Sequence, residues 1–405
     1  MIKTLSLPLI LIFAVLLSCQ TETTTAIEST AYPELIQRSE KIQHGKEWDH
    51  VQNIYSEKIN QLKKDPSNAE AKLVLAQLYI KEARVTGEHG HYYPAALTMI
   101  EKVLNSDVEL EPTIKFQALM HKAGVQLSLH EFADALKTGQ QAILLNPRNA
   151  QIHGVLVDAY VELGQYDKAI LLADKMVSMK PDLRSYSRIS YLREIHGDID
   201  GAIDAMTLAV EAGYPGYEET AWAMLTLAEL YHRYGQADKA EKIYEGILEM
   251  RNDYPFAVAA LGDLQYENGD LEKAQQTLNE AIDIIPEVGF YISLAHIYKD
   301  QNRTEDLEDI KKEILVMLED DVANGHNMNL EYTNLYLELF EEPETALSYI
   351  EKEYKKRPDN IDVNLLMAKV YRSLNDTSKL KMYADAAAVT KSVHPDLVQI
   401  QGSLN

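Results

Sequence analysis

Two groups of side chains have the type and spacing for chemistry: a single cysteine near the N-terminus and a close pair of histidines. Cys19 is the only cysteine in the 405 residues, and a thiol is a nucleophile that can be acylated. His89 and His91 lie two positions apart beside Glu88, and imidazole and carboxylate groups are suitable ligands for a transition metal. A metal site also needs a third or fourth ligand, which the sequence does not identify, so we predict no metal and no cofactor.

The residues before Cys19 have the layout of a signal peptide. Lys3 supplies a positive charge, and the uncharged stretch Leu5–Leu17 is too short to cross a bilayer of about 30 Å as a helix. The run from Leu16 to Cys19 resembles the bacterial lipobox, with an aliphatic residue three places before the cysteine and a small residue just before it. The alternative is an ordinary secretory signal in which the cysteine is incidental.

The lipobox resemblance implies cleavage before Cys19 and acylation of the new N-terminal residue. Two or more acyl chains anchor a soluble domain stably, so Cys19 is the predicted lipid anchor. The expected location is therefore the bacterial cell envelope. Gln20 is not the aspartate that retains lipoproteins in the inner membrane of some bacteria, which favours the outer membrane.

The composition limits which partners the protein can bind and which interactions can stabilise its fold. The formal charge of −24 argues against general affinity for nucleic acids, whose phosphates would be repelled. It is compatible with cationic partners, although solubility is the simpler explanation. Because no cysteine follows Cys19, intramolecular disulfides are impossible and the fold depends on packing alone. No further apolar stretch is long enough to span a membrane.

A repeating helical pattern begins near residue 47. Apolar residues recur at i, i+3, i+4 and i+7, and no segment shows sustained strand alternation. A small residue in one predicted helix is followed twelve positions later by an alanine in the next, as in Ala123 with Ala135 and Ala228 with Ala240. Tyrosine often follows the first small residue by three places, glycine marks the turn, and proline ends the second helix. These features predict a series of closely packed helical hairpins.

The pattern resembles the tetratricopeptide repeat family over most of the chain. The alanine position of the second helix recurs at intervals close to the family's repeat length: Ala96, Ala135, Ala169, Ala202, Ala240, Ala274, Leu307, Ala346 and Leu380. The resemblance implies an all-α, right-handed α-solenoid of about nine helical hairpins, with first helices lining a concave groove. Together, the lipobox and repeat resemblances divide the chain into four predicted parts: a signal peptide at 1–18, an acylated cysteine and flexible tether at 19–46, the repeat array at 47–390 and a tail at 391–405.

The family's register also predicts which side chains line the groove. They are Asp158, Glu162, Glu229, His232, Asp263, Tyr266, Glu267, His296, Lys299, Lys369 and Arg372. The middle of this set is acidic and its C-terminal end is mixed or basic. Chaperone-binding members of the family hold terminal carboxylates with Lys, Arg and Asn, and the acidic middle lacks such a set. The expected ligand there is a cationic or neutral segment.

The first predicted hairpin contains an insertion of about eight residues around 86–94. Our main interpretation is a longer loop whose tyrosines pack on the edge of the solenoid, with Pro94 starting the next helix. The alternatives are a partner contact made by His89, His91, Tyr92 and Tyr93, or a metal site. Longer spacings elsewhere, including 320–328, are interpreted as drift in tolerant loops.

No catalytic motif is evident, so we predict a protein that is not an enzyme. His130-Glu131 lacks the second histidine four residues after the first that a zinc protease motif requires. The preferred function is a membrane-anchored scaffold that binds envelope proteins or peptide segments in its groove. The alternative is a solute or glycan receptor associated with an envelope transporter, with Tyr191 and Tyr266 as stacking platforms.

Overall fold

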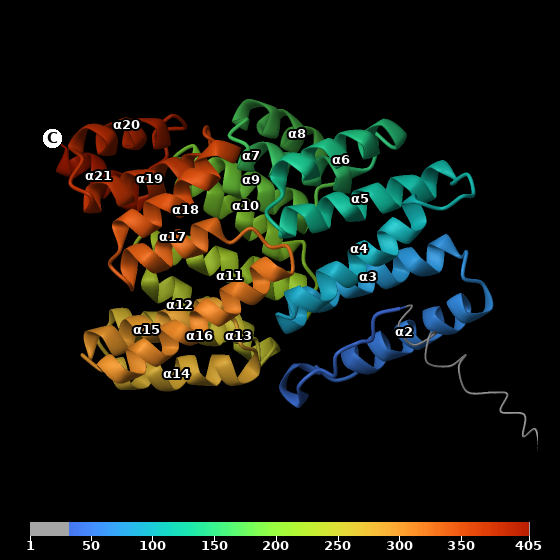
Figure 1. Ribbon diagram of the computed structural model, residues 1–405, viewed down its shortest axis with the longest axis horizontal. Helices are drawn as coiled ribbons and strands as arrows, with labels where there is room; N and C mark the ends of the chain where they lie inside the picture. The colour runs from blue at the N-terminus through green and yellow to red at the C-terminus, as the bar shows by residue number, and fades with distance from the viewer. Residues whose placement is uncertain (1–31, 405) are drawn as a thin grey trace, which may run out of the picture. The chain divides into compact units, whose positions relative to one another are not determined.

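The computed structural model describes residues 32–404 (Figure 1). The lipobox-like segment and Cys19 therefore lie outside the described residues. All described helices belong to one compact unit, Leu35–Asn405. None of the described helices is both long and apolar enough to cross a bilayer.

Residues 32–404 form helices joined by short turns and contain no strand. A short 3₁₀ helix, η1 (Glu40–Ile42), precedes α2 (Glu47–Lys64), and α21 (Pro395–Ser403) ends the series. Between them lie nine hairpins: α3 (Ala69–Thr86) with α4 (His89–Leu104), α5 (Pro112–Ser128) with α6 (Phe132–Leu145), α7 (Ala150–Glu162) with α8 (Tyr166–Met179), α9 (Leu183–Ile195) with α10 (Ile199–Glu211), α11 (Glu218–Arg233) with α12 (Ala237–Met250), α13 (Pro255–Glu267) with α14 (Leu271–Ile284), α15 (Val288–Asp300) with α16 (Thr304–Ala323), α17 (Asn329–Glu338) with α18 (Pro343–Lys356), and α19 (Ile361–Ser373) with α20 (Thr377–Ala387).

Small residues explain why the two helices of each hairpin pack closely. Ala123 in α5 and Ala135 in α6 are fully buried, as are Ala228 and Ala240 in α11 and α12. At Gly262 in α13, an added Cβ would lie 2.9 Å from Leu278 Cγ in α14, which is too close for carbon atoms. The predicted pairing of small residues is therefore the feature that sets the distance between helices.

The turn inside each hairpin uses a residue in the left-handed conformation. Glycine occupies this place in five hairpins, for example Gly164 with φ 70° and Gly269 with φ 83°. The other four hairpins use His130, Asn302, Glu341 or Asn375 at φ between 57° and 60°. A left-handed residue with a side chain costs about 1 kcal/mol relative to glycine, which packing of the two helices offsets.

The degenerate C-terminal repeats fold like the others, which confirms the predicted solenoid of about nine hairpins. Leu380, which replaces the usual alanine in α20, is only 7% exposed and packs in a cluster with Val370 and Tyr371. Each hairpin buries its apolar face against its neighbours, so the core extends along the array as successive clusters.

Both ends of the predicted array differ from the sequence-based boundaries. Residues 35–46, predicted as part of a tether, pack on α3, because the fully buried Arg38 side chain pairs with Glu82 at 2.7 Å. The predicted tail at 391–405 contains α21, whose Leu397 and Ile400 are almost fully buried. The folded body therefore begins near Leu35 and extends through α21.

The predicted long loop at 86–94 is wrong, because the extra residues lengthen helices. Only Gly87 and Glu88 separate α3 from α4, and Gly87 ends α3 in the left-handed conformation. Pro94 lies inside α4 and does not start it. Tyr92 and Tyr93 are 0% and 4% exposed, so neither is available as the surface contact considered above.

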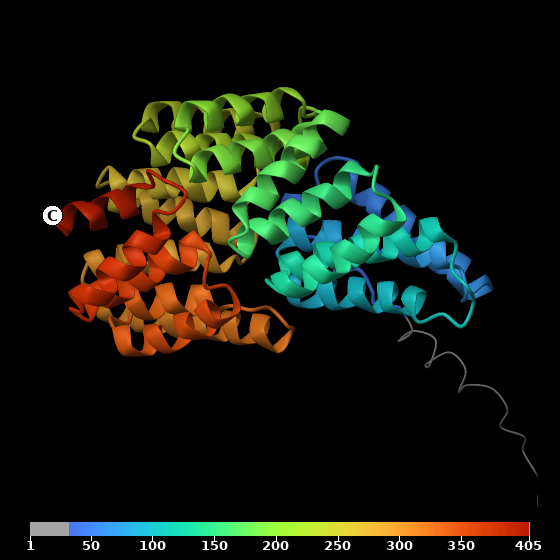
Figure 2. The same ribbon diagram turned by 90° about the horizontal axis from the view of Figure 1, so that it is seen from above.

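Units distant in sequence contact each other within Leu35–Asn405. The turn between α7 and α8 meets the turn between α18 and α19, where the Tyr166 hydroxyl accepts a hydrogen bond from the Ile361 backbone N–H at 2.8 Å. The first hairpin likewise contacts α16 (Figures 1 and 2). The inner surface of the array is therefore covered in part by the chain itself.

Candidate functional site

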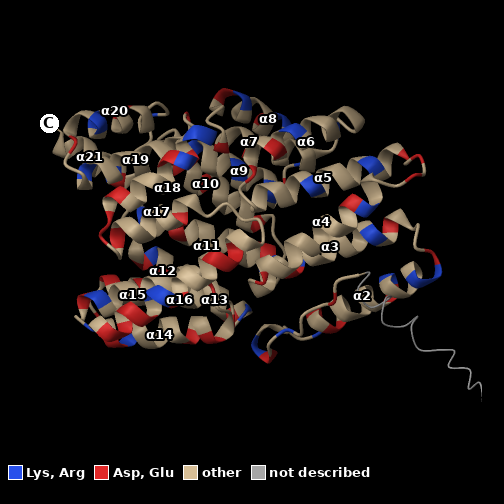
Figure 3. Ribbon diagram, viewed as in Figure 1, with Lys and Arg blue, Asp and Glu red and all other residues tan. Residues whose placement is uncertain are grey.

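The eleven predicted groove residues all lie on first helices of hairpins, toward the C-terminal half of each helix. They are Asp158 and Glu162 on α7, Glu229 and His232 on α11, Asp263, Tyr266 and Glu267 on α13, His296 and Lys299 on α15, and Lys369 and Arg372 on α19. Charged residues of both signs are distributed over these helices (Figure 3). Their contacts divide them into three groups.

The α7 end of the groove is engaged by the chain's own C-terminal repeats. Asp158 Oδ1 accepts a hydrogen bond from Arg188 Nε at 2.8 Å, and Glu162 forms an ion pair with Arg357 from the turn after α18. Burial raises the pKa of Glu162 to about 7, assisted by nearby Asp362 and opposed by Arg357. These two carboxylates act in internal contacts, and a partner would have to displace them.

The middle of the groove retains two carboxylates without a basic ion-pair partner. His232 Nε2 lies 2.7 Å from Glu267 Oε2, and the Tyr266 hydroxyl lies 2.7 Å from an Asp300 oxygen. By contrast, neither Glu229 nor Asp263 forms an ion pair with any residue of 32–404.

The pKa values of these two carboxylates show their electrostatic environment. Burial raises the pKa of Glu229, with a further contribution from Glu194, although Arg233 acts to lower it. Burial also raises the pKa of Asp263, with a further contribution from Glu267, although a hydrogen bond to the Ser293 side chain acts to lower it. A cation placed here would stabilise both ionised forms, because opposite charge within a few ångströms favours ionisation.

At the C-terminal end, the predicted basic residues are largely neutralised by the chain. Lys299 Nζ lies 2.7 Å from both the Glu338 carbonyl oxygen and Glu341 Oε1. Lys369 forms an ion pair with Asp396 of α21. His296 Nε2 lies 3.6 Å from Glu338 Oε2. Arg372 makes no ion pair within the described part of the chain.

A pocket of about 210 Å³ opens where α9 and α11 face α19 and α21. Its polar lining includes Tyr191, Glu194, Arg233, Asp362 and His394. The Tyr191 hydroxyl lies 3.3 Å from Asp362 Oδ2, and Arg233 pairs with Glu194. Of these residues, sequence reasoning identified Tyr191 alone, because Tyr191 and Asp362 are 171 positions apart and no local motif links them.

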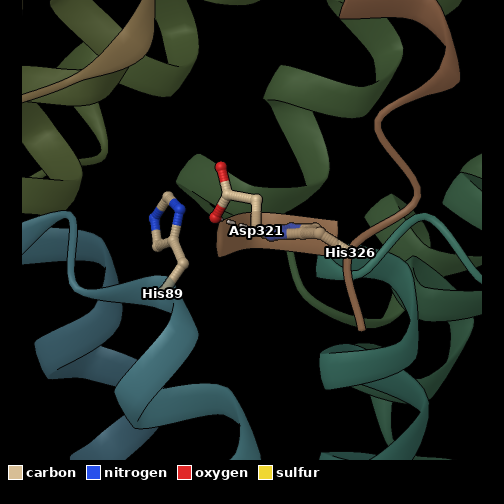
Figure 4. Close-up of side chains that lie close together, drawn as sticks. All are labelled: His89, Asp321 and His326. Carbon is tan, nitrogen blue, oxygen red and sulfur yellow. Dashed lines mark ion pairs between the residues drawn. The ribbon is translucent and has the colours of Figure 1, made fainter. Parts of the chain in front are cut away.

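The histidines of the first hairpin have different environments. His89 begins α4 and approaches Asp321 and His326 at the end of α16 (Figure 4). His91 stands edge-on to Tyr92, 4.9 Å between ring centres, and is not part of that cluster. The sequence singled out His89 and His91 together, and of the two only His89 lies close to Asp321 and His326.

Comparison with known families agrees with the hairpin geometry. A model of the tetratricopeptide repeat matches residues 126–193 and 234–288, which include the hairpins with the most regular spacing. These two segments of the chain carry tetratricopeptide repeats. Repeats of this kind are generally non-enzymatic scaffolds that bind proteins.

Two curated relatives share part of the repeat region. Cellulose synthase operon protein C of Pseudomonas fluorescens (strain SBW25) is 25% identical over 165 residues, which are 38% of this chain and 13% of that protein. The protein of the same name from Xanthomonas axonopodis pv. citri (strain 306) is 29% identical over 147 residues, 35% of this chain and 10% of that protein. The chain thus matches only a small part of either relative.

Solved tetratricopeptide structures resemble the chain in part. The Cut9–Hcn1 hetero-tetramer of the APC/C has 13% identity and a TM-score of 0.45, covering 89% of this chain and 60% of that one. A thermophilic tetratricopeptide protein of Thermus thermophilus has 25% identity and a TM-score of 0.38, covering 45% and 91%.

Proposed function

We propose that this protein is a scaffold of the bacterial cell envelope, anchored by lipid at Cys19, that binds a cationic segment of a partner protein. The repeats support the binding role, and the lipobox-like residues before Cys19 support the anchor. The observation that carries the binding proposal is the pair Glu229 and Asp263. These half-buried carboxylates lie on neighbouring first helices with raised pKa values and no basic ion-pair partner in 32–404.

The charge of the partner follows from the energetics of this pair. Holding buried carboxylates ionised is unfavourable unless an opposite charge or hydrogen-bond donors compensate them. A Lys or Arg side chain entering between α11 and α13 would supply both a charge and donors. An acidic or phosphorylated segment would be repelled. The proposed partner segment therefore carries at least one basic residue.

The receptor function has one specific observation in its favour, the pocket beside Tyr191. Its volume of about 210 Å³ is below the roughly 300–1,000 Å³ of typical small-molecule sites. Its charged groups are also already paired with each other, as Arg233 is with Glu194. The pocket therefore favours a small solute over a glycan, and the scaffold remains the better-supported function.

Neutral substitutions test the binding proposal without changing side-chain size. The double variant Glu229→Gln and Asp263→Asn should lose a stoichiometric partner that crosslinks to the wild-type protein in the parent cells. The matched control is Glu245→Gln with Asp204→Asn, two exposed positions on second helices. Equal recovery of the partner by both double variants would refute the acidic site as the binding determinant.

The anchor is tested separately. Cys19→Ser should abolish incorporation of labelled palmitate and move the protein from the membrane to the soluble fraction, because the thiol that receives the lipid is gone. A Cys19→Ser protein that still fractionates with membranes and needs detergent for extraction would contradict the anchor. Because the double variant keeps Cys19 and the Cys19→Ser variant keeps both carboxylates, failure of either proposal leaves the other interpretable.

A further inference from the structure

We propose that His89, Asp321 and His326 form a site for a divalent transition metal ion, best suited to Zn²⁺. One ligand atom from each of the three side chains lies within 4.8 Å of the other two. In Figure 4 the Asp321 carboxylate lies between the two imidazole rings. The site joins the first residue of α4 to the end of α16 and the turn that follows it.

The turn carrying two of these groups has a defined local structure. The backbone N–H of His326 donates to the Asp321 carbonyl at 2.9 Å, and Gly325 takes a positive φ of 94° between them. This arrangement brings His326 Nδ1 to 3.5 Å from Asp321 Oδ1. Asp321 lies in the last turn of α16, where the helix dipole adds partial negative charge that favours a cation.

The hydrogen bonding of His326 directs its Nδ1 atom toward Asp321, in a pairing that a metal ion would replace. Its Nε2 lies 2.5 Å from the Ser128 carbonyl oxygen, which can only accept, so Nε2 must carry the proton. The nitrogen that faces Asp321 is then Nδ1. A metal-binding histidine usually donates its second ring N–H to a carbonyl or carboxylate in this way, which fixes the ring and its tautomer. The backbone carbonyl of Ser128, the last residue of α5, thus holds the His326 ring from outside the cluster.

His89 is held by aromatic contacts and not by hydrogen bonds. Its ring stacks on Tyr93 with 5.4 Å between ring centres and meets His326 at 5.7 Å with an interplanar angle of 74°. Neither ring nitrogen of His89 forms a hydrogen bond to another group of residues 32–404.

Glu287 lies near the N-terminus of α4, because its Oε2 atom is 3.3 Å from the position where a Cβ would sit on Gly87, two residues before His89. The cluster itself consists of His89, Asp321 and His326, which leaves the fourth position of a tetrahedral ion to water.

The required rearrangement is small. Zn²⁺ binds histidine nitrogen and carboxylate oxygen at about 2.0–2.2 Å, so ligand atoms around a tetrahedral ion lie roughly 3.4 Å apart. The separations of up to 4.8 Å must then close by at most about 1.4 Å, which rotations of the side chains can supply. Binding would link hairpin α3–α4 to the α16–α17 turn across the array.

The test uses the full-length protein in detergent, freed of metal by chelator and titrated calorimetrically with Zn²⁺. The expected result is one saturable site that His89→Gln and Asp321→Asn each weaken tenfold or more. His91→Gln is the matched control, because His91 lies two residues away outside the cluster, and it should change the Kd less than twofold. Zn²⁺ should raise the Tm of the wild type and of His91→Gln only.

Co²⁺ provides a second readout, because four-coordinate Co²⁺ absorbs visible light strongly and an ion on scattered surface histidines does not. Circular dichroism and the Tm of the metal-free variants establish that they are folded, and His326→Gln replaces any variant that is not. It should weaken binding while leaving His89 and Asp321 in place. Absence of a saturable site, or equal losses in His89→Gln and His91→Gln, would overturn the proposal.

Discussion

Glu162 provides a sharp test of the contact between the α7 end of the groove and the C-terminal repeats. Its carboxylate pairs with Arg357, yet burial raises its pKa from 4.5 to about 7. Because the folded state then binds a proton more tightly than the unfolded state, stability is greatest below pH 4.5 for this group and is lost as the pH rises toward 7. Glu162→Gln removes this titration and leaves Arg357 bonded to Glu353 at 2.6 Å.

The magnitude follows from the shift. Each pKa unit corresponds to about 1.4 kcal/mol, so ionising Glu162 between pH 5 and pH 8 lowers the free energy of unfolding by roughly 2 kcal/mol. This figure allows for the 30% exposure of the Glu162 side chain. Subtracting the variant's stability from that of the wild type at each pH removes the contributions of the histidines and other carboxylates that both proteins share.

The assay is urea denaturation of both proteins at pH 5 and pH 8. The difference in free energy of unfolding should move by roughly 2 kcal/mol in favour of the variant as the pH rises. The control Glu245→Gln, at an exposed position of α12, should show no such movement. If the free energy of unfolding of Glu162→Gln differs from that of the wild type by the same amount at both pH values, the wild-type Glu162 carboxylate is not held in a desolvated contact.

Two further substitutions test the packing. Arg38→Met should destabilise the protein by about 3–5 kcal/mol in urea denaturation, because it leaves the fully buried Glu82 unpaired. The control Arg148→Met, at an exposed position, should have little effect on the free energy of unfolding. Equal losses of stability in the two variants would refute the packing of residues 35–46 on α3. Gly262→Ala should cost about 1–3 kcal/mol through its clash with the facing helix. By contrast, Gly246→Ala in mid-helix should stabilise by about 0.5–1 kcal/mol, because the added Cβ would meet only Met224 Cε, at an ordinary contact distance of 3.8 Å. Thermal melts that rank the two glycine variants the other way would contradict the close-packed hairpin.

The fold was predictable because its determinants are local. The pairing of Ala123 with Ala135, the glycine turns and the terminal prolines each act within one hairpin, and stacking of neighbours follows from the exposed apolar faces. The same local pattern misjudged 86–94, because nothing in spacing distinguishes a longer loop from two longer helices. Gly87 at φ 74° ends α3 there, and α4 begins at His89.

The site was predictable only in part, because its contacts join distant repeats. The family register correctly placed Glu229 and Asp263 on first helices, but it gave no indication that Arg357 would reach Glu162, 195 positions earlier. The approach of His326 to His89 likewise depends on the curvature of the array, which results from small rotations between many successive hairpins. No local sequence motif specifies that total rotation.

The central claim is that the inner surface between α11 and α13 holds a partner protein. A photo-crosslinking amino acid at Tyr266 on α13, compared with one at Glu245 on the outer helix α12, tests it most directly in the parent cells. The account predicts a discrete protein adduct from position 266 that is lost with Glu229→Gln and Asp263→Asn, and none from position 245. Adducts from position 245 alone, or no dependence on the two carboxylates, would contradict it.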